Sequence, residues 1–228
     1  MHGKIIIIEG LDGCGKSTQV DLLKNHFTGE KYRFLTFPDY QSLAGEIILE
    51  YLHKKIPETD SERSAYSASS FYAIDRYISY RRDWRVDYAQ GKTIISARYT
   101  TSNAIYQMTK LPREKWEDYR NWLYDYEYQK LGIPQPDEVI FLDVPVEVSQ
   151  KLLSERYQGE ESKKDAHESD IAYLRHCHDA ALYAGTVGKP WRFLQCCEEH
   201  QMKSIETIQN ELIAQIEEII NSCPEKQA

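Results

Sequence analysis

The sequence Glu9-Gly10-Leu11-Asp12-Gly13-Cys14-Gly15-Lys16-Ser17-Thr18 decides the fold class of this chain. It follows the apolar run Ile5 to Ile8, which predicts a buried strand, and it leads into a helical pattern that begins at Lys16. The spacing Gly-x-x-x-x-Gly-Lys-Ser is the P-loop pattern, here in the strand–turn–helix context that the pattern requires. The glycines let backbone N–H groups and a helix N-terminus face phosphates. The sequence therefore predicts a nucleoside triphosphate site.

Each position of this motif has a chemical reason. Lys16 is expected to reach the β- and γ-phosphates as a catalytic cation, and the Ser17 hydroxyl is expected to hold Mg²⁺. The residues predicted to surround the nucleotide are Gly10, Asp12, Gly13, Cys14, Gly15, Lys16, Ser17 and Thr18.

Composition and charge narrow the class of protein. The 228 residues are 41% hydrophobic and 28% charged, which is typical of a globular protein that folds in water. No apolar run reaches the length of a membrane span, and we expect no membrane partner. The formal net charge of −8 disfavours broad binding to nucleic acid. The five cysteines have neither zinc nor disulfide spacing, which predicts a reducing, cytoplasmic location.

Strand and helix patterns alternate along the whole chain. Strands are expected at Lys4–Glu9, Tyr32–Phe37, Thr93–Ala97, Glu138–Val144 and Trp191–Cys196. Helices are expected at Lys16–Phe27, Leu43–Lys54, Glu62–Gln90 with a break near Asp83, Ser102–Met108, Arg113–Leu131, Val146–Arg156, Asp170–Tyr183 and Ser204–Ser222. This order predicts an α/β fold, a three-layer P-loop NTPase-type sandwich whose five-stranded parallel sheet carries helices on both faces. Residues 1–228 are expected to form a single domain.

Two segments interrupt the regular pattern. Residues 113–131 are rich in aromatic side chains at helical spacing, which indicates a core face or a partner interface more than a ligand site. Residues 156–169 are polar and contain Lys163 and Lys164. A lid that closes over phosphates has this character, and so does a solvated surface loop.

A second pocket is predicted beside the P-loop, because three segments supply aromatic, amide and cationic groups. Residues 37–40 follow the second strand, where open α/β sheets place ligands. Tyr72 and Arg76 are four residues apart on one helical face, where a ring and a guanidinium can recognise a base. Residues 98–107 follow the third strand and begin with an arginine suited to phosphate.

Taken in order, these motifs resemble the thymidylate kinases over nearly the whole chain. That family commonly has the P-loop form seen at residues 9–18, the Phe-Pro-x-Tyr variant at residues 37–40, and an aromatic-x-x-x-Arg stretch like residues 72–76. Its Arg-Tyr-x-x-Ser-Asn-Ala stretch corresponds to residues 98–104, and its Leu-Asp-Val strand end corresponds to residues 142–144. The resemblance implies a P-loop kinase that transfers the γ-phosphoryl group of ATP to dTMP, with Mg²⁺ as cofactor.

The resemblance also assigns roles to residues of the second pocket. Asp12 would face the sugar 3′-hydroxyl, and Tyr106 would pack under the deoxyribose. Tyr72 would stack on thymine, with Arg76 at the base carbonyl and Asn103 at the pyrimidine edge. Arg98 would hold the acceptor phosphate, with Tyr40 close to it. The residues expected to contact dTMP are Asp12, Phe37, Tyr40, Tyr72, Arg76, Arg98, Ser102, Asn103, Tyr106, Gln107 and His167.

The lid segment and the P-loop share the remaining catalytic roles. The P-loop contains no arginine between its glycines, so the resemblance implies that a lid cation, Arg156, Lys163 or Lys164, supplies catalytic charge. Glu168 is placed near the metal and His167 near the sugar. The family also implies a homodimer packed through core helices, and the apolar positions Ala65, Ala68 and Ile78 permit one.

One position departs from the family pattern. The third strand usually ends in Asp-Arg-Tyr, and this chain has Ala97-Arg98-Tyr99. Loss of one preorganised polar group can cost on the order of 10²–10³ in rate. This departure leaves open a catalytically weak nucleotide-binding protein. A kinase of another nucleoside monophosphate also stays open, because the P-loop motif alone does not select the substrate.

Overall fold

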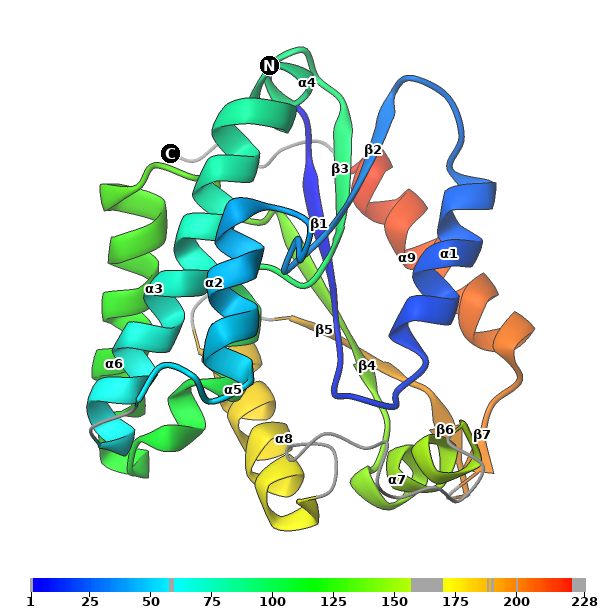
Figure 1. Cartoon of the computed structure of the whole chain (residues 1–228). Helices are drawn as coiled ribbons and strands as arrows, with labels where there is room; N and C mark the ends of the chain where they lie inside the picture. The colour runs from blue at the N-terminus through cyan, green and yellow to red at the C-terminus, as the bar shows by residue number, and fades with distance from the viewer. Residues whose placement is uncertain are drawn as a thin grey trace.

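A parallel sheet forms the centre of the molecule. The computed structural model describes residues 2–57, 60–156, 170–187, 189, 191–199 and 201–222, with the backbone alone at residue 156. The strands are β1 (Ile5–Glu9), β2 (Tyr32–Thr36), β3 (Thr93–Ala97), β4 (Glu138–Asp143) and β5 (Arg192–Gln195). Their order is β2-β3-β1-β4-β5, and every neighbouring pair is parallel (Figure 1). The predicted α/β sandwich is confirmed.

The central strand β1 shows why this sheet needs helices on both faces. All five of its residues are buried. Ile5 and Ile7 join one hydrophobic cluster, whereas Ile6 and Ile8 join the other, because successive side chains of a strand point to opposite faces. A strand buried on both sides reads as a continuous apolar run.

The helices form two layers around the sheet (Figure 1). One layer contains α1 (Lys16–His26) and α9 (Ile205–Asn221). The other contains α2 (Leu43–Leu52), α3 (Ser61–Ser79), α5 (Thr100–Tyr106), α6 (Trp116–Tyr124) and α8 (Ile171–Thr186). Helix α7 (Val146–Arg156) lies near the carboxyl ends of the strands, in the lower part of the view. Shorter elements are η1 (Tyr80–Trp84), α4 (Arg85–Ala89), η2 (Met108–Lys110), η3 (Arg113–Lys115), η4 (Asp125–Lys130), β6 (Cys197–Glu198) and β7 (Gln201–Met202).

Two local features refine the sequence prediction. The expected break near Asp83 is a π-helical turn, η1, between α3 and α4. The antiparallel pair β6–β7 was not predicted, because two residues per strand are too few to give a periodic pattern.

The aromatic face of α6 is buried within the chain. Trp116 and Tyr119 are at most 1% exposed, so this face of α6 is core, as predicted.

Ala65 and Ala68 were expected to be available to a second copy, but both are 0% exposed inside this chain. Their small size lets α3 pack closely within the protomer instead. Among the helices described here, we find none with the length and apolar character needed to cross a membrane.

Candidate active site

The P-loop connects the end of β1 to the start of α1. Gly15 precedes the helix with φ 82°, and Gly13 has φ 79°, a left-handed conformation that favours glycine. A side chain at Gly13 would also come within 2.7 Å of the Ser149 carbonyl oxygen on α7. Lys16 Nζ donates to the Gly10 carbonyl oxygen at 2.9 Å, which holds the ammonium group across the loop. The loop therefore has the glycine-dependent backbone shape that phosphate binding requires.

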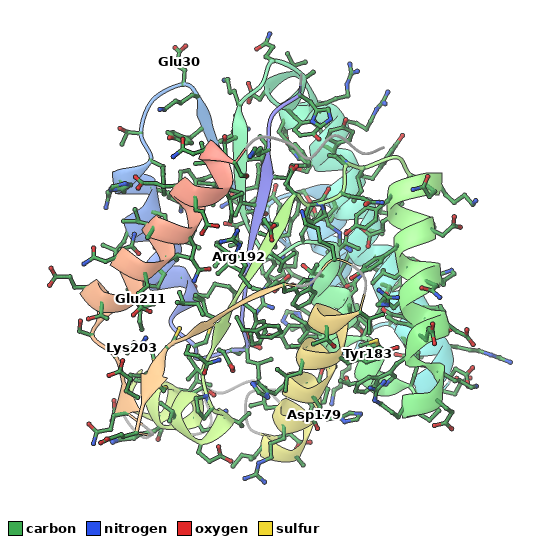
Figure 2. The ribbon with its side chains drawn as sticks, turned by 180° about the vertical axis from the view of Figure 1, so that it is seen from behind. Glu30, Asp179, Tyr183, Arg192, Lys203 and Glu211 are labelled. Atoms are coloured by element: carbon green, nitrogen blue, oxygen red, sulfur yellow. The ribbon has the colours of Figure 1, made fainter. Side chains whose placement is uncertain are left out.

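A cavity of about 590 Å³ opens in front of this loop. All predicted nucleotide residues except Gly10 line it: Asp12, Gly13, Cys14, Gly15, Lys16, Ser17 and Thr18. Met202 and Lys203 also line this cavity, and Glu211 accepts hydrogen bonds from Lys203 Nζ at 2.9 and 3.0 Å. Figure 2 shows Lys203 just before α9 and Glu211 on that helix. The unpredicted β6–β7 pair therefore helps to enclose the nucleotide cavity.

A second cavity, of about 210 Å³, lies beside the first. It is lined by all predicted acceptor residues that the structure describes: Asp12, Phe37, Tyr40, Tyr72, Arg76, Arg98, Ser102, Asn103, Tyr106 and Gln107. These residues come from segments up to 95 positions apart, since Asp12 is the first and Gln107 the last. They converge because the carboxyl ends of parallel strands meet at one edge of the sheet.

Arg98 and Asp12 connect the two cavities. Arg98 Nη2 donates to Asp12 Oδ1 at 2.5 Å, and the guanidinium carbon lies 5.0 Å from the centre of the Tyr106 ring. Burial works against the charge of Arg98, but Tyr106, Asp12 and Glu9 together raise the pKa of Arg98 well above its ordinary value. The guanidinium is therefore a permanent cation in both cavities.

Ala97 lies next to this pair and lines the nucleotide cavity. It ends β3 beside Ile8 of β1, and its side chain is only 7% exposed. Arg98 follows with φ 66° and donates its backbone N–H to the Ile8 carbonyl oxygen at 3.1 Å. The backbone and Asp12 thus fix Arg98 although no carboxylate stands at position 97.

The loop after β2 is tied to α3 by Asp75. Its carboxylate accepts the Asp39 backbone N–H at 2.9 Å and the Ser42 hydroxyl at 3.0 Å. Burial raises the pKa of Asp75, and these two hydrogen bonds act in the opposite direction. Asp75 thereby anchors the loop that carries Phe37 and Tyr40, which both line the second cavity.

Arg76 has a buried partner that sequence reasoning missed. Glu127 of η4 accepts Arg76 Nε at 2.7 Å and Arg76 Nη2 at 2.6 Å. The side chains are 3% and 0% exposed, respectively. Glu127 stands among aromatic residues that form the core, so no local pattern marked it. Only the structure reveals the need for this partner, because it shows that Arg76 is buried and a buried guanidinium requires one.

A second buried carboxylate supports α5. Glu9 is 0% exposed and accepts the Thr101 hydroxyl at 2.6 Å and the Ser102 hydroxyl at 2.8 and 3.0 Å. Ser102 lines the second cavity, but its hydroxyl donates its hydrogen bond to the Glu9 carboxylate. Glu9 therefore links the end of β1 to the helix that carries Asn103.

The lid predictions fall beyond the described residues. Lys163, Lys164, His167 and Glu168 lie outside them. Arg156 ends α7, which places its backbone at the carboxyl edge of the sheet, but its side chain also lies outside the description.

Comparisons with known proteins agree with this geometry. The sequence profile of the family "Thymidylate kinase" matches residues 8–194. The thymidylate kinase of Mycobacterium tuberculosis is 31% identical over 196 residues, which cover 82% of this chain and 87% of that protein. A probable thymidylate kinase of Thermococcus onnurineus is 30% identical over 217 residues, or 93% of this chain and 96% of that one.

The fold agrees as well. A solved structure of thymidylate kinase from Candida albicans has a TM-score of 0.69 and 22% identity, and the match covers 95% of this chain and 92% of that chain. At this identity the structural likeness shows the fold, while the sequence matches show the family. This chain belongs to the thymidylate kinase family.

Proposed function

We propose that this protein transfers the γ-phosphoryl group of ATP to dTMP, giving dTDP and ADP. The observation that carries the proposal is the shared wall of the two cavities: Asp12, Phe37 and Arg98 line both. A donor phosphate at the P-loop and an acceptor phosphate at Arg98 would then meet without crossing bulk water. Such proximity can supply several orders of magnitude in rate.

The reaction follows from this arrangement. An oxygen of the dTMP phosphate attacks the γ-phosphorus in line, and the bond to the β-phosphate oxygen of ATP breaks. The transition state is loose and highly charged, so catalysis consists of positioning and charge neutralisation. Lys16 supplies positive charge on the donor side, and Arg98 supplies it on the acceptor side. A covalent enzyme intermediate is not required.

The base would occupy the inner part of the second cavity. Tyr72 offers a flat ring, and burial raises its pKa, so the phenol remains protonated and neutral at physiological pH. Arg76 and Asn103 would bind the polar edge of thymine. Burial likewise raises the pKa of Tyr106, whose hydroxyl donates to the Gly10 carbonyl oxygen at 3.4 Å. This bond would hold the ring under the deoxyribose, where a ribose 2′-hydroxyl would collide.

The residues at the P-loop fit a magnesium ion. The Ser17 hydroxyl is exposed in the nucleotide cavity, which the Asp12 carboxylate also lines. In the part of the chain that the structure describes, no group of three or more His, Cys, Asp or Glu side chains could hold a metal by itself. Mg²⁺ suits such a site because it retains waters and substrate phosphates beside one or two protein oxygens. When bound, Mg²⁺ would neutralise charge between the β- and γ-phosphates.

The lid residues and the assembly complete the proposal. Arg156, Lys163 and Lys164 would add cationic charge over the phosphates, with Glu168 near the metal and His167 near the sugar.

For a homodimer, the exposed apolar side chains Leu43, Ile47 and Ile74 of α2 and α3 offer the surface that Ala65 and Ala68 do not. The four described cysteines are free thiols, which supports a reducing cytoplasm.

The direct test is to follow the labelled γ-phosphoryl group of ATP. We expect the label in dTDP when dTMP is the acceptor, and much less label in products from AMP or UMP. Transfer to AMP or UMP at the rate seen with dTMP would contradict the proposed acceptor.

A further inference from the structure

Glu127 is a buried carboxylate that accepts hydrogen bonds from residues of the second cavity, although it does not line that cavity itself. Besides two donors from Arg76, it accepts the Thr100 hydroxyl at 2.8 Å and Asn103 Nδ2 at 3.5 Å. Arg76 and Asn103 line the second cavity, whereas Thr100 and Glu127 do not. One carboxylate therefore organises two side chains that face the ligand.

The first consequence concerns which hydrogens of Arg76 remain for a ligand. Glu127 takes the Nε and Nη2 edge in a two-point contact, which fixes the plane of the guanidinium. Nη1 donates to the Tyr99 carbonyl oxygen at 3.4 Å. Nη1 has a second hydrogen, and Arg76 can only donate. At this point the cavity therefore offers a donor and demands an acceptor from the ligand.

The second consequence concerns the orientation of the Asn103 amide. Its Nδ2 donates to the Ser69 carbonyl oxygen at 3.3 Å and to Glu127. Both partners are acceptors only, so the amide nitrogen must point toward them. Among the described residues, no donor is bonded to Asn103 Oδ1, and Asn103 lines the cavity. At this second point the cavity offers an acceptor and demands a donor.

We propose that Glu127 is a positioning residue that makes the pocket select a 4-oxo pyrimidine carrying N3–H, and reject cytosine. Thymine and uracil present a carbonyl oxygen at C4 and a donor at N3, which match Arg76 and Asn103. Cytosine presents an amino group at C4 and an acceptor at N3, so both contacts are reversed. This inference rests on the proposed function, because it assigns the second cavity to a pyrimidine nucleotide.

The variant Glu127→Gln tests this role at nearly constant size. A glutamine offers a donor as well as an acceptor, so the Ser69 carbonyl oxygen alone then fixes Asn103 Nδ2, and the amide turns more readily to present Nδ2 to cytosine. We expect kcat/KM with dTMP to fall roughly 10- to 100-fold, mainly through KM, because hydrogen bonds to a charged group are disturbed. The ratio of kcat/KM for dTMP to that for dCMP should fall at least tenfold. An unchanged ratio would overturn the proposal.

Two further variants separate positioning from folding. Glu127→Asp keeps the charge, and we expect it to retain more of the dTMP-to-dCMP ratio than Glu127→Gln. Trp116→Phe removes a buried hydrogen bond to the Leu111 carbonyl oxygen, 3.0 Å long, away from the pocket. It should lower the unfolding midpoint and leave the ratio unchanged. A ratio that falls equally in Trp116→Phe would mean that loss of stability alone explains the effect.

Thr100→Val keeps the test open if Glu127→Gln does not fold. It removes the 2.8 Å hydrogen bond to Glu127 Oε2 and a hydrogen-bond contact with Tyr128, and it leaves the ion pair of Arg76 with Glu127 in place. We expect a smaller fall of the same ratio, and no fall would overturn the proposal. Calorimetric binding of dTMP and dCMP repeats the comparison without turnover. If the wild type forms no dTDP but binds dTMP over dCMP, and Glu127→Gln lowers that binding preference, the proposed function fails while the role of Glu127 stands.

Discussion

Asp12 of the P-loop and Arg98 at the end of β3 form an ion pair, with 2.5 Å between Oδ1 and Nη2, at the boundary of two cavities. Their side chains are 28% and 21% exposed, so ligands in either cavity can reach them. The pair joins the segment that would hold the donor phosphates to the cation that would hold the acceptor phosphate. Under the proposed function, this contact would align the two substrates.

Asp12→Asn should weaken this alignment without unfolding the protein. We expect kcat with dTMP to fall by roughly 10²-fold, because misplacing a catalytic group by about 1 Å has that cost. Steady-state kinetics check the rate, and circular dichroism checks the fold. Asp21→Asn is a matched control, since it breaks an exposed 2.8 Å ion pair with Lys24 on α1 and should leave kcat unchanged. Equal rates for Asp12→Asn and the wild type would remove Asp12 from the mechanism.

Ala97→Asp restores the carboxylate that the family usually has at this position. The structure already holds Arg98 through Asp12 and the backbone, so we expect kcat to change by no more than about threefold, well below the cost of losing a preorganised polar group. Steady-state kinetics with dTMP measure the change. A rise above tenfold would show instead that the natural protein is catalytically impaired.

Lys16→Met should separate donor chemistry from acceptor binding. Lys16 lines the nucleotide cavity and not the second cavity. We expect kcat to fall on the order of 10³-fold, as for loss of a preorganised charge-stabilising group. The dissociation constant for dTMP, measured by calorimetry, should stay within about threefold of the wild-type value. Loss of dTMP binding would mean that the two cavities are not separate sites.

His178 and Asp143 predict a pH dependence of stability. His178 Nε2 lies 2.7 Å from Asp143 Oδ1, and this hydrogen bond raises the pKa of His178 from 6.5 and lowers that of Asp143 from 3.8. The pair is therefore most stabilising when the histidine is charged and the aspartate ionised. Its contribution is lost as pH rises through the folded pKa of His178, and also as pH falls through the folded pKa of Asp143.

Denaturant unfolding of the wild type and His178→Gln measures this contribution. We expect the difference in unfolding free energy to be on the order of 1 kcal/mol near pH 5 and to shrink toward pH 8. Glu50→Gln is the control, because it breaks an exposed ion pair with Lys55 that does not act on His178. A difference that grows from pH 5 to pH 8 would contradict the assigned pair.

The sequence revealed the parts of the site that follow strands. The P-loop follows β1, Phe37 follows β2 and Arg98 follows β3, so parallel topology alone predicts that they meet. Glu127 was not predictable in this way. It lies in a π-helical turn inside an aromatic face, and its contact with Arg76 depends on how that turn packs against α3. The β6–β7 pair was not predicted, because each strand has two residues and is too short to show an alternating pattern of apolar and polar residues.

The most direct test of the account is the rate of ADP release from ATP and Mg²⁺, measured without acceptor, with dTMP and with UMP at equal concentration. The account predicts release that depends on dTMP and exceeds the rate with UMP by at least tenfold, because Tyr106 would exclude the 2′-hydroxyl of the UMP ribose. Release that dTMP does not increase, or that UMP increases equally, would contradict it.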